Sequence, residues 1–517
     1  MKDFLVLHQA KITGVLGCFD RVIFRGYLPL QDGYSMAHFL NQNGLCFRDL
    51  KSFLFEHSNR VKSHAQAWAE REGRPFEYLT SRVPMERRAR EMAGRDGIEQ
   101  GLVCVFSALE PCRTFSFRFQ RGRPFVQAAR RKCLFLYFYI MDPRFGLIHV
   151  KVQTWFPMMI QVTLNAHEWL AIKLTDNGIH YTKIDNVFTH IDDIERAQAF
   201  SDRFASLDWP TVLEALARQV NPLLDDLLFG LQHYWVTAQS EYATDVMFTR
   251  RDALKALYPR LISHSMQCFG VKEVMGFLGR KLTGHFEGEL ITDLLGLWHE
   301  RIPGVRIKHR VQENWIKMYD KAGRVLRIET VINNPNGFRV RKSVRRQGQA
   351  TTEWVPLRKG VAYLFRYRDI SHSANSRYLD ALTLVSDPTA KVAELDRLTR
   401  RKRSTSGRTA KPFNPMARDE LQLFHALMDG ADSLRGFTNC DLRTRLEATS
   451  HLAKQRGDPK RESAKVSRIP HRFHTHGLIA KYTHSRRWRT TRLGRRLMAT
   501  AIQVRELNFP QLLALAP

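Results

Sequence analysis

The clearest alternation of apolar and polar residues in this chain runs through residues 306–334. Successive side chains of a β-strand point to opposite faces of a sheet, so alternate residues share a face. RIKHRV (306–311), WIKMYDK (315–321) and VLRIETVI (325–332) alternate in this way, and the segment KAGR between the last two has the composition of a tight turn. The pattern predicts a three-stranded β-meander.

One face of this meander is predicted to be apolar and to pack against a core. The other face is predicted to carry charged residues, namely His309, Lys317, Asp320, Arg327 and Glu329. Because these residues come from neighbouring strands, their side chains can converge on one mixed-charge site. The alternative is an ordinary sheet that exposes separate Lys/Glu pairs to solvent.

Metal-assisted cleavage of a phosphodiester requires two or three oxygen or imidazole ligands and a nucleophile close to phosphorus. The candidate ligands for Mg²⁺ or Mn²⁺ are Asp245, His309, Asp320 and Glu329, of which Asp320 and Glu329 are also candidate catalytic residues. An enzyme would bring at least two of these groups within about 5 Å of a shared point beside a basic groove. A binding protein can leave them as isolated ion pairs.

The meander, with YDK and LRIE on neighbouring strands, resembles that of plasmid and phage replication initiators, and this resemblance implies a tyrosine nucleophile, which is expected on a helix beside the sheet. Tyr378 meets this expectation, because it lies on a helical segment after the meander with Asn375 one turn earlier. Tyr319, at the end of a strand, is a second candidate. The alternative for Tyr378 is a packing role on an amphipathic helix, beside Leu379 and Leu382.

The sequence YDK, followed by a turn and a strand that reads LRIE, resembles the core of plasmid and phage rolling-circle replication initiators. The resemblance covers residues 315–332 and, loosely, residues 240–332. It implies a nucleic-acid-nicking fold in which acidic and His residues hold a divalent metal and a Tyr attacks a phosphodiester. The chain lacks the paired His-hydrophobe-His run that such nickases often contain, and this difference argues against a nickase.

The pattern along the whole chain predicts an α+β multidomain protein. Two mixed α/β-sheet domains are expected, over residues 1–200 and 201–395, followed by a basic linker (396–415) and a C-terminal domain (416–517). Residues 15–30 are predicted to form a pair of strands.

Composition indicates the kind of partner. The 517 residues carry a formal net charge of +30, to which arginine contributes strongly, so a polyanion and above all nucleic acid is expected. A membrane partner is not expected, because no basic amphipathic helix has a clean apolar face and no apolar run reaches the length of a membrane span. The seven cysteines are dispersed, and the N-terminus does not read as a signal peptide, so a cytoplasmic protein is predicted.

Two basic segments are candidate nucleic-acid contacts. In residues 113–125, Arg118 and Arg121 alternate with phenylalanines, as in a platform for single-stranded nucleic acid. The alternative there is an edge strand with one buried face. From Arg397 to Pro415 the linker is rich in Ser, Thr, Lys and Arg and contains no acidic residue, so it is predicted to be mobile. Its candidate contacts are Arg401, Lys402 and Arg403.

The C-terminal segment predicts helices followed by two short strands, GLIAKY and RRWRTT, and a last helix. This order resembles a winged helix-turn-helix over residues 415–505, which implies a recognition helix at about 463–476 that enters a groove and a wing on the backbone. Pro470 is expected to kink that helix, and the insertion at 450–464 exceeds a tight turn, so an RNA-duplex or protein partner is the alternative to DNA. The candidate contacts are Arg468, Arg472, Arg486, Arg487, Arg489, Arg492, Arg495 and Arg496.

The stretch CFDRVIFRG (18–26) resembles the opening of a family of long bacterial proteins, and this resemblance implies no particular chemistry. The sequence as a whole leads to the hypothesis of a nucleic-acid-binding protein, with DNA favoured over RNA. Its central part would be a metal-dependent nuclease of the replication-initiator or mobile-element kind. The competing hypothesis is a non-enzymatic regulator or a partner of a structured RNA.

Overall fold

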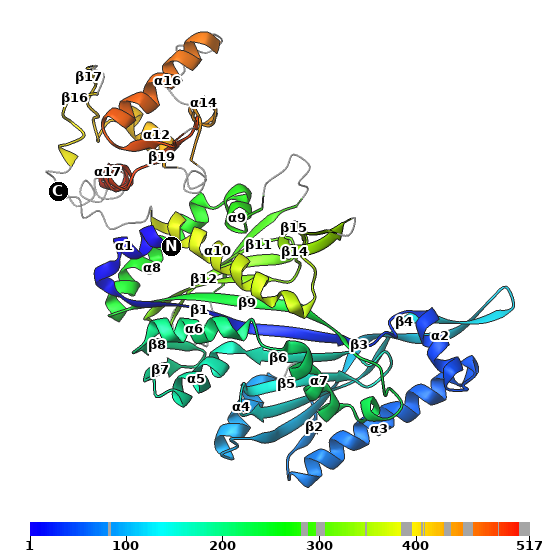
Figure 1. The fold of residues 1–517 in the computed structure, drawn as a ribbon. Helices are drawn as coiled ribbons and strands as arrows, with labels where there is room; N and C mark the ends of the chain where they lie inside the picture. Colours follow the sequence, from blue (N-terminus) through cyan, green and yellow to red (C-terminus); the bar gives the residue numbers. More distant parts are fainter. Residues whose placement is uncertain are drawn as a thin grey trace.

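The computed structural model describes residues 1–80, 84–280, 288–295, 305–346, 349–383, 395–404, 407, 409–428, 436–447, 459–483 and 485–505, which form a mixed α+β fold. Strands from both predicted sheet domains join one 11-stranded sheet, in the order β10-β11-β12-β13-β9-β1-β6-β5-β4-β3-β2 (Figure 1). The expected division into two separate sheets is therefore replaced by one continuous sheet.

The sheet is made of the following strands: β1 (Ile12–Tyr27), β2 (Phe76–Tyr78), β3 (Gly101–Gln120), β4 (Arg123–Asp142), β5 (Gly146–Gln153), β6 (Ile160–Asn165), β9 (Tyr234–Phe248), β10 (Leu290–Leu295), β11 (Arg306–Val311), β12 (Asn314–Lys321) and β13 (Val325–Ile332). Helices pack around it: α1 (Lys2–Leu7), α2 (Gly33–Gln42), α3 (Leu50–Arg71), α4 (Met85–Arg95), α5 (Ala166–Asp176), α6 (Ile194–Phe204), α7 (Trp209–Val220), α8 (Arg251–Cys268), α9 (Val271–Phe277) and α10 (Leu364–Leu382). Two hairpins stand apart from the sheet: β7 (Tyr181–Ile184) with β8 (Val187–Ile191), and β14 (Arg339–Arg346) with β15 (Gln349–Pro356).

The two halves of the sheet repeat one order of elements. In each half a long strand is followed by helices, and then by four antiparallel strands of which the last pairs back with the long strand. The long strand is β1 in the first half, where β6 returns to it, and β9 in the second half, where β13 returns to it. Because β1 and β9 pair with each other, residues near the middle of both strands lie side by side at the centre of the sheet.

The predicted meander is confirmed as β11, β12 and β13, with an apolar face that packs against α10. Leu326, Ile328 and Ile332 are fully buried on this face. Asn375 of α10 fixes the contact, since its amide accepts a hydrogen bond from Thr330 and donates to β9. The charged face is buried too: every residue of β13 is buried, so this face is enclosed rather than solvated.

Several elements differ from their predicted form. Residues 15–27 of the predicted strand pair belong to one long strand, β1, which has partners along both edges. The arginine- and phenylalanine-rich residues 113–125 form the end of β3 and the start of β4, which pair with each other. Their phenylalanines divide between a buried base and an exposed tip, as described below.

The C-terminal part of the chain has its own hydrophobic core, which includes Leu421, Phe424 and Phe473. Its elements are α12 (Arg418–Leu427), α14 (Asn439–Leu446), α16 (Pro459–Thr475), β18 (Ile479–Lys481), β19 (Trp488–Thr490) and α17 (Arg492–Gln503). Phe437 adds a β-bridge to Trp488, so three short extended segments lie together. The kink predicted at Pro470 does not divide the helix, because α16 continues through this residue.

The segment predicted as a mobile linker is partly packed. Leu398 and Phe413, near its two ends, are buried in the C-terminal core. Between them, β16 (Lys402–Arg403) pairs with β17 (Thr409–Ala410). The prediction was wrong for these ends because two apolar residues suffice to anchor a polar segment. Most of the predicted insertion, residues 450–458, lies outside the described residues.

Candidate functional site

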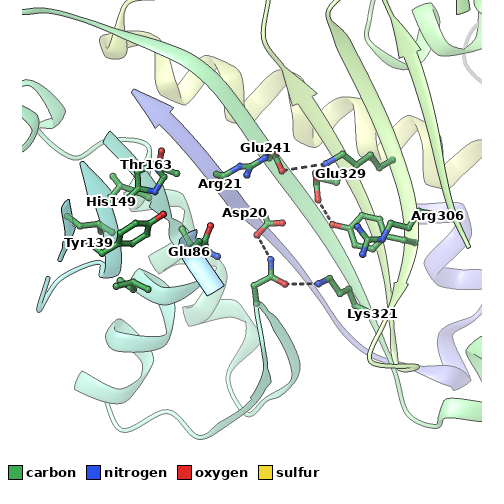
Figure 2. Close-up of a pocket in the computed structure, with 17 residues that line it drawn as sticks. Asp20, Arg21, Glu86, Tyr139, His149, Thr163, Glu241, Arg306, Lys321 and Glu329 are labelled. Carbon is green, nitrogen blue, oxygen red and sulfur yellow. Dashed lines mark hydrogen bonds and ion pairs between the residues drawn. The ribbon is translucent and has the colours of Figure 1, made fainter. Parts of the chain in front are cut away.

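A polar cavity of about 280 Å³ lies on the face of the sheet opposite α10. Its walls come from β1, β9, β12 and β13 on one side and from β4, β5 and β6 on the other (Figure 2). Both halves of the sheet therefore contribute to it. The residues of the meander that line it are Arg306, Lys317, Tyr319, Lys321 and Glu329.

Three buried carboxylates meet in this cavity. Asp20 comes from β1, Glu241 from β9 and Glu329 from β13, and Figure 2 shows the three side chains turned toward a common space. One carboxylate oxygen of each lies within 4.8 Å of the others. Carboxylate oxygens are the ligands that Mg²⁺ and Mn²⁺ prefer, so these three residues could hold a hard divalent cation if their side chains moved slightly closer together.

A β-bulge brings Asp20 into the group. The pairing of β1 with β9 passes from Phe19–Tyr242 directly to Arg21–Glu241, so Asp20 has no residue opposite it on β9. The extra residue of a bulge is free of the strict alternation of a strand, and bulges often re-aim a side chain at functional sites. Asp20 and Arg21 consequently both line the cavity although they are adjacent in sequence.

Basic and hydroxyl groups surround the carboxylates. The Lys317 ammonium donates to Glu329 at 2.5 Å and lies 3.5 Å from Glu241. The Tyr319 hydroxyl also donates to Glu329, and Arg21 donates to Glu241 at 2.5 Å. The mixed-charge site predicted on the meander is thus present, with Lys317, Tyr319 and Glu329 at its centre.

These contacts shift the pKa values of Glu329 and Glu241 in opposite directions. Burial would raise the pKa of Glu329, but Lys317 and the Tyr319 hydroxyl outweigh it and lower that pKa to about 2. Burial raises the pKa of Glu241, and the negative charge of Glu329 raises it further against the opposing effect of Lys317 and Arg21. Glu329 is therefore a firmly ionised carboxylate, and Glu241 is the one whose proton is more easily gained.

A second network, formed by Arg327 and Asp245, contacts Asp20 from outside the cavity. Arg327 is fully buried, donates to both carboxylate oxygens of Asp245 at 2.6 and 2.7 Å, and donates to Asp20 at 3.1 Å. Burial would raise the pKa of Asp245, but the Arg327 guanidinium lowers it to about 2. Asp245 is therefore committed to Arg327, and its role is to position that guanidinium against Asp20.

The wall formed by the first half of the sheet offers polar groups without partners. Thr163 is only 8% exposed and lines the cavity, and within the described chain its hydroxyl has no hydrogen-bond partner. His149 lies on the same wall, where burial lowers its pKa to about 4 and keeps the ring neutral. The Thr163 hydroxyl is therefore available to donate to, or accept from, a molecule in the cavity.

A second hollow of about 460 Å³ lies beside the cavity on the same face of the sheet. Its lining includes Arg25, Arg310, Lys359 and Trp315, with Glu313 as its acidic residue. Trp315 lies two residues before Lys317 on β12 and therefore shares its face. A hollow with three basic side chains thus lies on the same strands as the carboxylate cavity.

Two of the four predicted metal ligands lie on the wrong face. His309 is opposite Ile316 on β12, and Asp320 is opposite Leu326 on β13, so both side chains point toward the helix-covered face. Asp245 is held by Arg327, and only Glu329 belongs to the carboxylate group. The predicted set of Asp245, His309, Asp320 and Glu329 is therefore corrected to Asp20, Glu241 and Glu329.

The predicted nucleophile is also misplaced. Tyr378 lies on α10 and is fully buried, and its hydroxyl donates to Ser265 and lies 3.1 Å from the His309 ring nitrogen. This packing matches the alternative weighed for Tyr378. Asp320 lies on the same face, where burial raises its pKa to about 6, and takes no part in the cavity. Tyr319, the second candidate, is the tyrosine that lines the cavity beside Glu329.

The arginines predicted to contact nucleic acid divide into two groups. Arg472 is used internally: it pairs with Glu420 and stacks 3.8 Å from the Phe413 ring centre. Arg487 donates to a backbone carbonyl, Arg495 pairs with Asp3, and Arg496 is half buried. The side chains at the surface are Arg468, Arg486, Arg489, Arg492, Arg118, Arg121, Arg401 and Arg403, with Lys402 half buried.

Asp20 and Glu241 are the two functional candidates that sequence reasoning missed. Each is an acidic residue inside a largely buried strand, in CFDRVIF and in QSEYATD. That signal was available, because a carboxylate is rarely buried without a specific partner. The convergence of Asp20 and Glu241 could not be predicted from the sequence, because it depends on the pairing of β1 with β9 across more than 200 residues of chain.

No protein-family model matches this chain, and neither does any curated protein or solved structure. Among the described residues, helices that are both long enough and apolar enough to cross a membrane are absent. The site's own geometry therefore carries the functional argument.

Proposed function

We propose that this protein binds nucleic acid and cleaves a phosphodiester with the help of a divalent cation at Asp20, Glu241 and Glu329. The observation that carries the proposal is the convergence of three buried carboxylates from three strands in one polar cavity. Folding tolerates such a group of negative charges only when cations compensate it, so the site is built to hold positive charge. Mg²⁺ or Mn²⁺ is the proposed ion.

The cavity contains the groups that phosphoryl transfer needs. A bound cation would polarise a phosphate oxygen, while Arg21, Arg306 and Lys317 supply positive charge for the phosphate itself. The Tyr319 hydroxyl is the proposed nucleophile in place of Tyr378. The hydrogen bond to Glu329 would orient the Tyr319 hydroxyl. The Tyr319 oxygen would form a bond to phosphorus, the bond to the leaving oxygen would break, and the leaving oxygen would take up the proton that the hydroxyl loses.

The C-terminal part supports the nucleic-acid half of the proposal. We propose that α12, α14 and α16, with the β18–β19 hairpin, form a winged helix-turn-helix, as the sequence resemblance implies. Val466, Ile469 and Phe473 of α16 face the core, whereas Arg468 and His471 are exposed. The exposed face of α16 would enter the major groove of DNA, and the β18–β19 hairpin would lie along the backbone.

A second candidate function is nucleic-acid binding without catalysis. It is favoured by one observation: each of the three carboxylates already has a basic partner, Arg327, Arg21 or Lys317. A fully compensated network needs no metal. In that case the cavity would stabilise the junction between the two halves of the sheet.

Cleavage assays with paired variants test the proposal. Labelled single-stranded and duplex DNA and structured RNA would be incubated with the protein in Mg²⁺, in Mn²⁺ and in EDTA. We expect metal-dependent cleavage that falls by at least about 100-fold in Glu329→Gln, the scale of losing one electrostatic stabiliser of a transition state. Tyr319→Phe should abolish any covalent adduct with the cleaved strand.

The matched controls are Asp320→Asn and Tyr378→Phe, which change the same chemical groups on the opposite face of the sheet. Both should cleave at the wild-type rate. Tight binding with no cleavage by the wild type in either metal would overturn the catalytic proposal and favour the binding protein. Loss of cleavage in Tyr378→Phe, together with cleavage at the wild-type rate in Tyr319→Phe, would overturn the assignment of the nucleophile.

A further inference from the structure

We infer that the paired ends of β3 and β4, residues 111–132, are an arm that inserts into the major groove of duplex DNA. This segment is called the β3–β4 ribbon below. The inference rests on the nucleic-acid part of the proposed function and is independent of the cleavage chemistry. It assigns the DNA contact to a second surface, separate from the C-terminal helices.

The β3–β4 ribbon extends beyond the rest of the sheet. β5 pairs with β4 only from Phe135 to Asp142, and β2 pairs with β3 only from Val105 to Ser107. Between residues 111 and 132 the two strands therefore pair only with each other. Figure 1 shows this pair projecting past the sheet next to α2.

The base of the ribbon is anchored and its tip is free. Phe115 and Val126 are buried in the main core, and the start of α2 touches the strand so closely that a Cβ on Gly33 would lie 2.1 Å from the Val126 carbonyl oxygen. Beyond this contact, residues 118–124 are all exposed. An arm that is held at one end and exposed at the other can enter a groove without unfolding.

All charged side chains of the ribbon are basic. Residues 111–132 contain no Asp or Glu, and they contain the basic residues Arg113, Arg118, Arg121, Arg123, Arg130, Arg131 and Lys132. Arg113 and Arg130 are directly opposite each other, an arrangement that destabilises a sheet. Throughout the described chain, these seven side chains make neither ion pairs nor side-chain hydrogen bonds. Their charge serves no contact within the fold and is complementary to a polyanion.

The positions of the charges fit two phosphate backbones. One group lies near the base of the ribbon (Arg113, Arg130, Arg131, Lys132) and the other at the tip (Arg118, Arg121, Arg123). Arg113 and Arg118 are five residues apart, or about 17 Å at roughly 3.4 Å per residue. A ribbon that crosses a groove about 12 Å wide would place these two groups of side chains near the phosphates on opposite walls of the groove.

The shape of the ribbon selects B-form DNA among the nucleic acids. The major groove of B-DNA admits a two-stranded β-ribbon, whereas the major groove of an RNA duplex is too deep and narrow. A platform for single strands needs several exposed aromatic rings. Here Phe115 is buried and Phe117 half buried, so Phe119, at 68% exposed, is the one phenylalanine largely open to solvent.

Binding measurements in EDTA test this inference. The affinity for a labelled duplex of about 20 base pairs would be measured by fluorescence anisotropy over a range of salt concentrations, for the full chain and for the variant Arg118→Gln/Arg121→Gln/Arg123→Gln. We expect the variant to bind at least about tenfold more weakly. Its slope of log K against log salt should be shallower by about 2 to 3, or roughly 0.9 for each lost phosphate contact.

The matched control is Arg71→Gln/Arg87→Gln/Arg250→Gln, which removes the same charge from side chains that are 70%, 74% and 79% exposed elsewhere. It should keep the wild-type slope. An equal loss in this control, or no loss in the ribbon variant, would overturn the inference. So would a larger loss for single-stranded DNA, an RNA duplex or phosphatidylserine vesicles than for duplex DNA. Ribbon-dependent duplex binding without any cleavage in Mg²⁺ would support the ribbon while overturning the proposed chemistry.

Discussion

Arg327 is a fully buried charge that joins two strands of the sheet. It donates to Asp245 on β9 and to Asp20 on β1, while itself lying on β13. Removing one partner of a buried ion pair leaves the other charge uncompensated in a poorly solvated place. The position of Asp20 in the carboxylate group therefore depends on a residue that does not line the cavity itself.

Substituting Arg327 by Met should destabilise the protein strongly. We expect Arg327→Met to lower the free energy of unfolding by about 3–5 kcal/mol, since it strands the carboxylates of Asp245 and Asp20. Arg21→Met is the control, because that guanidinium is 47% exposed and should cost only about 1 kcal/mol. Urea unfolding of both variants measures the difference. An equal loss of unfolding free energy in the two variants would contradict this role of Arg327.

Two histidines with lowered pKa values, His309 on the helix-covered face of the sheet and His264 on α8, make stability depend on pH. Burial lowers the pKa of His309 and of His264 to about 4, below the value of about 6.5 expected in the unfolded chain. Between these values the unfolded state binds more protons, so stability is lost as the pH falls from about 6.5 toward 4.

His309→Gln should weaken this dependence by up to about 1.4 kcal/mol per pH unit, the contribution of one proton. Urea unfolding between pH 4 and 7 measures it. His190→Gln is the control, because His190 is exposed and contacts Asp192 at the surface. An unchanged slope in His309→Gln would mean that this ring is not held neutral by the fold.

At the scale of elements, alternation along a strand explains which sequence predictions succeeded. Lys317 and Glu329 were predicted to share a face and do so, because cross-strand register follows from a short turn. Asp320 and His309 were assigned to that face although each is one residue out of phase with it. Asp20 could not be placed by alternation at all, because the bulge that re-aims it leaves no local mark in the sequence.

The C-terminal elements provide a prediction at this scale. α17 approaches the preceding segment so closely that a Cβ on Gly494 would lie 1.9 Å from the Leu478 carbonyl oxygen. Gly494→Ala should therefore destabilise the C-terminal core by about 1–3 kcal/mol and weaken duplex binding.

Hydrogen exchange of α17 and α16 would detect this loosening, while the central sheet should exchange as in the wild type. Gly94→Ala is the matched control: it lies in α4 with open space around its Cβ position, and it should be neutral or stabilising by up to about 1 kcal/mol. Unaltered protection of α17 in Gly494→Ala would contradict the tight packing of this helix.

At the scale of the whole molecule, the two sheet domains predicted from the sequence share one continuous sheet. Each half follows one order of strands and helices, and the local pattern predicted the meander of the second half. The pairing of β1 with β9 joins residues more than 200 apart, and no local pattern specifies it. The cavity lies across that junction, so its lining is a property of the assembled sheet.

The most direct test of this account is whether Asp20, Glu241 and Glu329 hold a divalent cation. Mn²⁺ would be titrated calorimetrically into the wild type, into Glu241→Gln and into Asp320→Asn, with circular dichroism as a check on folding. The account predicts one site in the wild type, at least about tenfold weaker binding in Glu241→Gln, and wild-type binding in Asp320→Asn. Absence of binding by the wild type, or equal binding by all three proteins, would contradict it.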